Sequence, residues 1–248
     1  MTDRDGARVA VVTGGSSGIG WASCARLRSD GFRLAVCDLD GDRAAEAAGP
    51  GGLGRAVDVS DAGQVADFFD CVVEAYGRID VLVNNAGITG SRETTVLHVT
   101  PVEEWDRVFG VNVRGPFLCS RAALPVMMAQ RSGHVITIAS VAGQVAFPGR
   151  SAYTASKGAA LMLAKSIAVD YAGYGIRSNA VCPGMAETAM TKWRLDDPEL
   201  RAQIEARIPM GRVARPEEVA DAVGVLASDR LGYLTGAALV IDGGYTAL

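Results

Sequence analysis

The sequence predicts an α/β protein, with a doubly wound parallel sheet of seven strands and helices on both of its faces. Short apolar runs that are typical of buried strands alternate with segments of helical period, as right-handed βαβ crossovers require. A glycine-rich turn joins the first apolar run to the first helical segment. The 248 residues include 30 glycines spread along the chain and no linker-like stretch, so we expect one domain over residues 1–248.

The candidate strands are the apolar runs Arg8 to Thr13, Arg33 to Asp38, Leu53 to Asp58, Ile79 to Asn84, His134 to Ser140, Arg177 to Cys182 and Ala238 to Asp242. Two helix starts are marked in the sequence. Thr100-Pro101-Val102-Glu103 predicts a helix capped by Thr100, and Pro216-Glu217-Glu218 predicts the helix before the last strand.

Composition excludes several classes of function. The net charge is −4, the pI is about 5.3 and no basic run is present, which argues against nucleic acid or anionic lipid as a partner. The polar start of the chain leads into an apolar run too short for a signal peptide or a membrane span, so we expect a cytoplasmic protein. Five cysteines without a C-x-x-C pattern and two histidines, His98 in a loop and His134 at a strand edge, predict free thiols and no metal site.

The segment from Glu187 to Arg215 interrupts the alternation of strands and helices. It carries Met190, Ile204 and Met210 as apolar anchors, and it follows the carboxyl end of a strand, where open α/β sheets bind ligands. A surface insertion is one interpretation. We favour a mobile substrate lid at about residues 187–215.

The first apolar run ends in Thr13-Gly14-Gly15-Ser16-Ser17-Gly18-Ile19-Gly20. Backbone N–H groups of such a turn and the helix N-terminus behind it can bind a pyrophosphate, and glycines at 14, 18 and 20 permit close approach. Asp38 ends the second run eighteen residues after Gly20, near the offset of a carboxylate that accepts hydrogen bonds from ribose hydroxyls. The sequence therefore predicts a Rossmann-type dinucleotide site.

Tyr153 and Lys157 are spaced to share one face of a helix. A tyrosine titrates near ~10, and a fixed ammonium group favours its phenolate. Lowering the pKa of Tyr153 by about three units requires roughly 4 kcal/mol, which Lys157 together with a positive nicotinamide could supply. This pair predicts general acid–base chemistry.

These motifs together resemble the classical short-chain dehydrogenase/reductase family over essentially the whole chain. Thr13 to Gly20 is similar to the family's T-G-x-x-x-G-x-G, Asn84 to Gly87 to its N-N-A-G, and Asn112 to Gly115 to its N-V-x-G. Ser140 stands thirteen residues before Tyr153, as in the family. The ending Asp242-Gly243-Gly244 also fits.

The resemblance implies a catalytic set of Asn112, Ser140, Tyr153 and Lys157. Ser140 would hold the substrate oxygen and Tyr153 would transfer the proton. Lys157 would hold the nicotinamide ribose, and Asn112 would position a water beside Lys157. Each role suits the side chain's donor and acceptor groups.

The resemblance also implies which residues contact the cofactor, with Pro183 to Thr188 at its carboxamide end; Ala186 replaces the family's more usual valine or isoleucine. The cofactor set comprises Gly14, Ser16, Ser17, Gly18, Ile19, Gly20, Asp38, Leu39, Asp58, Val59, Asn85, Ala86, Gly87, Tyr153, Lys157, Pro183, Gly184, Ala186 and Thr188. The candidate substrate pocket is largely apolar and comprises Val141, Gln144, Val145, Phe147, Met185, Met190 and Trp193.

NAD is the expected cofactor, because the 2′-phosphate of NADP would meet the like charge of Asp38. Leu39 follows Asp38, and Ser16-Ser17 stand where NADP-using relatives often carry arginine or lysine; Arg43 is the nearest downstream cation. The apolar stretch Gly158 to Ala172 needs cover on more than one side, which predicts a homo-oligomer, and the resemblance implies a tetramer.

The function expected is interconversion of a secondary alcohol and a ketone. A 3-oxoacyl thioester reductase that uses NADPH is the alternative, and a non-catalytic nucleotide sensor is disfavoured because the full acid–base set is present. An extended epimerase or dehydratase is disfavoured because the last predicted strand ends six residues before Leu248. An enoyl reductase is disfavoured by the short spacing of Tyr153 and Lys157.

Overall fold

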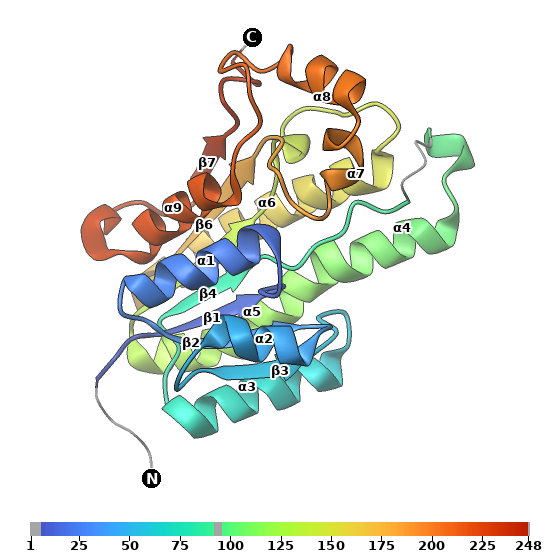
Figure 1. Ribbon diagram of the computed structural model, residues 1–248. Helices are drawn as coiled ribbons and strands as arrows, with labels where there is room; N and C mark the ends of the chain where they lie inside the picture. The colour runs from blue at the N-terminus through green and yellow to red at the C-terminus, as the bar shows by residue number, and fades with distance from the viewer. Residues whose placement is uncertain (1–5, 92–95, 248) are drawn as a thin grey trace.

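A computed structural model describes residues 6–91 and 96–247, and it confirms the predicted doubly wound parallel sheet (Figure 1). Neighbouring strands pair in parallel in the order β3-β2-β1-β4-β5-β6-β7. The strands are β1 (Val9–Thr13), β2 (Arg33–Asp38), β3 (Leu53–Ala56), β4 (Val81–Asn84), β5 (Gly133–Ile138), β6 (Ile176–Pro183) and β7 (Ala238–Ile241).

Three strands end earlier than predicted: β7 ends at Ile241, one residue before the predicted end, and the differences in β3 and β5 lie beside the candidate site. β3 ends at Ala56 rather than at Asp58, and β5 ends at Ile138 rather than at Ser140. Single hydrogen bonds continue beyond each end, from Val57 N to Asp38 O and from Ala139 N to Val181 O, but the regular ladder has stopped. The residues beyond these ends therefore lie in turns, where their side chains are free to face a ligand.

Helices cover both faces of the sheet. One face carries α3 (Ala62–Tyr76), α5 (Gly115–Gln130) and α6 (Ser151–Tyr171), which pack on an apolar core with β1, β4 and β5. The other face carries α1 (Gly18–Ser29), α2 (Gly41–Ala48) and α9 (Pro216–Ala227) over a second core. Among the helices described, none combines the length and apolar character that crossing a bilayer requires.

The predicted helix starts are confirmed in one case and shifted in the other. α9 begins at Pro216 as predicted. α4 (Val102–Phe109) begins one residue late, with Pro101 at the cap position. The Thr100 hydroxyl donates instead to the Val96 carbonyl over 3.1 Å, so the predicted threonine cap is wrong.

His134 is a core residue and not the predicted strand-edge residue. It lies in β5 between β4 and β6 and is 2% exposed. Nδ1 donates to the Leu226 carbonyl at 2.9 Å, and Nε2 accepts from the Asn179 amide at 2.9 Å. Both ring nitrogens are thus used by a neutral imidazole, and burial lowers the pKa of His134 to about 3.

The segment proposed as a lid contains α7 (Lys192–Leu195) and α8 (Pro198–Glu205), which lie apart from the helices that cover the sheet (Figure 1). Its two ends are joined, because Glu187 N donates to Ala214 O and Ala214 N donates to Met185 O, both at 2.9 Å. Its buried anchors are Leu195, Ile208 and Val213, with Ile204 partly buried beside them. The other two predicted anchors are more exposed, Met190 at 39% and Met210 at 66%.

Candidate active site

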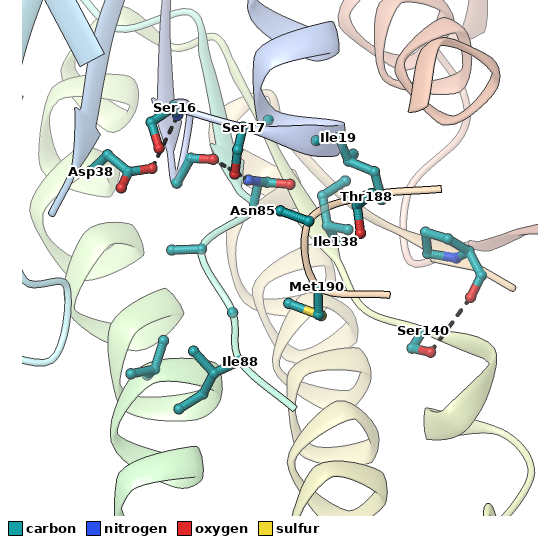
Figure 2. A pocket seen from close by; sticks show the side chains of 18 of the residues that line it. Ser16, Ser17, Ile19, Asp38, Asn85, Ile88, Ile138, Ser140, Thr188 and Met190 are labelled. Carbon is teal, nitrogen blue, oxygen red and sulfur yellow. Dashed lines mark hydrogen bonds between the residues drawn. The ribbon is translucent and has the colours of Figure 1, made fainter. Parts of the chain in front are cut away.

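A cleft of about 330 Å³ opens beyond the carboxyl ends of the strands (Figure 2). Asp38 and Ser140 lie at opposite ends of the view. Every residue that the sequence predicted for cofactor binding lines this cleft: Gly14, Ser16, Ser17, Gly18, Ile19, Gly20, Asp38, Leu39, Asp58, Val59, Asn85, Ala86, Gly87, Tyr153, Lys157, Pro183, Gly184, Ala186 and Thr188.

The glycine-rich turn is held open by Asn85 from the neighbouring strand. Its Nδ2 donates to the carbonyl oxygens of Thr13 (3.0 Å) and Gly14 (2.8 Å). Gly14 has a φ of +66°, and a side chain at Gly20 would overlap the Gly14 carbonyl oxygen. Ser17, the N-cap of α1, makes no side-chain capping bond, so N–H groups of the first turn of α1 remain to receive an anion.

Asp38 lies beside this turn, at the carboxyl end of β2. Its Oδ2 accepts the Ser16 N–H at 3.0 Å, which fixes the carboxylate beside the turn (Figure 2). The Arg43 guanidinium lies over the Trp21 ring, 5.8 Å from its centroid. A carboxylate in this position could accept hydrogen bonds from the ribose hydroxyls of a dinucleotide.

Tyr153 and Lys157 lie on α6, and Ser140 follows β5. Lys157 Nζ donates to the Ile138 carbonyl at 2.9 Å and lies 5.7 Å from the centroid of the Tyr153 ring. Burial raises the pKa of Tyr153 and a hydrogen bond with Ser140 partly opposes this, whereas burial lowers the pKa of Lys157 to about 8. In the protein without cofactor, the hydrogen bond with Ser140 favours the phenolate of Tyr153. The sequence had predicted this effect for the charge of Lys157.

Asn112 lies outside the lining of the cleft, in the π-turn Gly110–Arg114 between α4 and α5. Its amide is tied to Ile88, with Nδ2 donating to Ile88 O and Oδ1 accepting from Ile88 N, both at 2.8 Å. A Cβ at Gly87 would lie 3.3 Å from both Asn112 Oδ1 and Lys157 Nζ. Glycine thus leaves a small space between these two polar groups, where a water can be held.

Of the seven candidate pocket residues, Met190 lines the cleft (Figure 2). Val141 is buried and Val145 is 39% exposed. The other four contact neighbouring side chains: Gln144 donates to Cys182, Phe147 stacks on Tyr245, Met185 packs beside Leu195, and Trp193 lies under Arg194.

Sequence reasoning missed lining residues that adjoin motif positions. Val57, Ile88, Val111, Ile138, Ala139, Ala189 and Thr191 each lie within three residues of a predicted site residue and line the cleft. Their positions next to the motif residues are the signal that could have identified them, because a turn presents successive residues to a ligand.

Two arginines near the catalytic end were also missed. Arg150 precedes Tyr153 by three residues and donates to the Ser91 carbonyl, and Arg194 lies in α7. Burial lowers the pKa of both guanidinium groups, and the charge of Arg150 lowers the pKa of Arg194 further. The charge of Arg150 thus acts on Arg194, while the Glu104 carboxylate acts on Arg150, and neither arginine is among the residues that line the cleft.

Comparison with known proteins gives consistent results. A family model described as enoyl-(acyl carrier protein) reductase matches residues 14–246. 2-(R)-hydroxypropyl-CoM dehydrogenase of Xanthobacter autotrophicus is 55% identical over 97% of this chain and 99% of its own. Cis-4-hydroxycyclohexanecarboxylate dehydrogenase of Sinomonas cyclohexanicum is 42% identical over 97% of each chain.

The solved structure of ElxO with NADP bound superposes with a TM-score of 0.90, at 28% identity, over 98% of this chain and 100% of that one. The family uses a nicotinamide cofactor, and the relatives named above are dehydrogenases of secondary alcohols. The chain therefore belongs to the short-chain dehydrogenase/reductase family and is an oxidoreductase of the alcohol–ketone type.

Proposed function

We propose that this protein is an NAD-dependent secondary alcohol dehydrogenase in which Tyr153 is the general acid–base. One observation carries the proposal: Ser140, Tyr153 and Lys157 open onto the same cleft as the glycine-rich turn and Asp38. When bound, the nicotinamide accepts or donates the hydride. The protein has then to hold the alcohol and move its hydroxyl proton.

The chain's own groups suit those tasks. The Ser140 hydroxyl holds the substrate oxygen, and the Tyr153 oxygen takes its proton when the alcohol is oxidised. Lys157 orients the nicotinamide ribose, and once the cofactor is bound its charge favours the phenolate of Tyr153. The space beside Gly87, between Asn112 and Lys157, holds a water that passes the proton outward.

NAD is proposed over NADP because of Asp38. Its carboxylate can accept from both ribose hydroxyls, whereas a 2′-phosphate would meet its charge while Arg43 lies over Trp21. The NADP-bound structure is that of ElxO, which is 28% identical to this chain, and its cofactor is a property of that protein. Steady-state kinetics with both cofactors test the preference, and an equal or higher kcat/KM with NADP would contradict it.

We propose a substrate that carries an anionic group some bonds away from the alcohol, as in a 2-hydroxyalkyl thioether with a terminal sulfonate. The name of the 55% identical relative denotes such a compound, since coenzyme M is a thiol that bears a sulfonate, and the 42% identical relative is named for a carboxylate. Arg150 and Arg194 are the candidate cations, because the charge of one acts on the other and a guanidinium group binds a sulfonate or carboxylate through paired N–H donors.

The decisive experiment follows the absorbance of reduced nicotinamide with 2-hydroxypropyl-CoM, with an uncharged alkyl thioether of the same length and with simple secondary alcohols. We expect the sulfonate to give the highest kcat/KM. Arg194→Gln should raise KM for the sulfonate about tenfold or more and leave KM for the uncharged analogue nearly unchanged. Equal KM changes for both substrates would contradict the anion site.

Tyr153→Phe tests the chemistry separately. The variant should fold and bind NADH, yet lose about 10²–10⁴ in kcat. Turnover equal to that of the parent protein would refute the role of Tyr153. Reduction of a 3-oxoacyl thioester with NADPH, without turnover of secondary alcohols, would favour the alternative function.

We also propose a homo-oligomer, with a tetramer as the expected form. On α6, Met162 is 60% exposed and Val169 is 80% exposed, so the apolar helix has an outer face that a partner subunit would cover.

A further inference from the structure

We propose that Thr191 is a positioning residue for the cofactor, because its hydroxyl holds the turn that carries Ala186 and Thr188 against the dinucleotide. Thr191 lines the cleft and immediately precedes α7. The proposal rests on the nicotinamide cofactor of the family and is independent of the choice between NAD and NADP.

A single hydroxyl ties both ends of this turn together. Thr191 Oγ1 lies 2.6 Å from the Ala186 carbonyl oxygen and 3.0 Å from the Thr188 nitrogen. Because a carbonyl can only accept and an N–H can only donate, the hydroxyl donates to Ala186 and accepts from Thr188. The six residues from Ala186 to Thr191 are thereby closed by one side chain.

The same oxygen also orients the hydroxyl of Thr188. The two hydroxyl oxygens are 3.3 Å apart, and the hydrogen of Thr191 is already used by Ala186. The Thr188 hydroxyl therefore donates toward Thr191, and this bond helps to fix the side chain of Thr188 at the lining of the cleft.

The position of the turn matters because it faces the phosphate-binding turn at close range. A Cβ at Gly18 would lie 3.1 Å from the Thr188 Cβ and Cγ2 atoms. The bridge between Ala186 and Ala214 holds only the start of this turn. Thr191 thus holds the rest of the turn, including Thr188, beside the glycine-rich turn.

Thr191→Val tests the proposal, because it keeps the size of the side chain and removes the hydroxyl. We expect the Kd for NADH, measured by fluorescence titration or calorimetry without substrate, to rise about tenfold or more through faster dissociation. The loss should be similar for NADPH. The pH dependence of kcat at saturating cofactor should stay that of the parent, because Thr191 touches no proton-transfer group.

Two controls separate this role from general stabilisation. Thr191→Ser keeps the hydroxyl and should restore Kd to within about threefold of the parent. Thr235→Val removes a hydroxyl that also bonds the backbone of Ser178, on β6 away from the cleft, and should change the melting temperature without changing Kd.

The proposal is overturned if Thr191→Val binds NADH within twofold of the parent, if Thr191→Ser loses as much affinity as Thr191→Val, or if Thr235→Val loses the same affinity. Failure of Thr191→Val to fold would also overturn it, since the hydroxyl would then serve the whole fold rather than the cofactor turn.

Discussion

A methyl group at Gly20 would collide with two elements of the phosphate-binding turn at once. It would overlap the Gly14 carbonyl oxygen and lie 2.5 Å from Asn85 Nδ2. Both atoms belong to the hydrogen bond that fixes the turn, from Asn85 Nδ2 to Gly14 O at 2.8 Å. Gly20→Ala therefore has to displace the Asn85 amide, the turn or the first turn of α1.

The magnitude follows from these contacts. Displacing Asn85 Nδ2 threatens its bonds to Thr13 O and Gly14 O, at about 0.5–1.5 kcal/mol each. Overpacking against backbone adds roughly 1–3 kcal/mol. We expect Gly20→Ala to lower the free energy of unfolding by about 2–6 kcal/mol and to weaken NADH binding, because the turn proposed to receive the pyrophosphate moves.

Urea unfolding and NADH titration measure the two effects. Gly173→Ala is the matched control, because a Cβ there meets nothing within 4 Å and the residue has no positive φ. That control should change stability by less than about 1 kcal/mol. The reasoning is refuted if Gly20→Ala unfolds at the same urea concentration as the parent and binds NADH equally well.

Three further predictions concern other parts of the molecule. The folded-state pKa of His134 is about 3, below its unfolded value near 6.5, so the neutral imidazole stabilises the fold fully above pH 6.5. This stabilisation, up to about 5 kcal/mol, is lost as pH falls toward 3. In urea unfolding at several pH values, the free energy of unfolding should fall less steeply with pH for His134→Asn than for the parent, and equal pH dependence would contradict this. Asp38→Ala should narrow the preference for NAD mainly by raising KM for NAD, as steady-state kinetics with both cofactors would measure. If kcat/KM with NADP rose by a larger factor than kcat/KM with NAD fell, hydrogen bonding to the ribose would not be the main effect. Replacing Met162 and Val169 by aspartate should lower the mass that light scattering reports at micromolar protein, and a parent protein that is already monomeric would remove the oligomer proposal.

The sheet could be predicted from sequence because its strands are continuous apolar runs with glycine turns between them. The predicted ends of β3 and β5 were wrong because apolar residues continue each run beyond the hydrogen-bonded ladder. Val57 and Ala139 are apolar because they lie against buried neighbours, yet they stand just beyond the ladders of β3 and β5. An apolar residue type indicates that a side chain is buried. The last residue of a strand depends instead on where the neighbouring strand moves out of hydrogen-bonding distance.

The residues that line the candidate cofactor cleft could be predicted because each part of the cleft is a local motif with a fixed chain position. The substrate side could not, because it depends on contacts between distant segments. Phe147 stacks on Tyr245 near the carboxyl terminus, and the charge of Arg150 lowers the pKa of Arg194. No spacing in the sequence encodes either pair. His134 shows the same limit, since its partners Asn179 and Leu226 come from elements far along the chain.

We expect the proposed acid–base set to be complete only when the cofactor is bound, because of the surroundings of Lys157 and Tyr153. In the protein alone the ammonium group of Lys157 is bonded to the Ile138 carbonyl, and burial lowers its pKa to about 8 while raising the pKa of Tyr153. Two buried groups that both disfavour their charged forms make a poor base at neutral pH. A ribose that accepts from Lys157 and a positive nicotinamide beside Tyr153 would shift both equilibria toward ammonium and phenolate. Proton transfer would thereby be coupled to cofactor binding, so an alcohol that enters the cleft first would meet a tyrosine that is not yet able to act as a base.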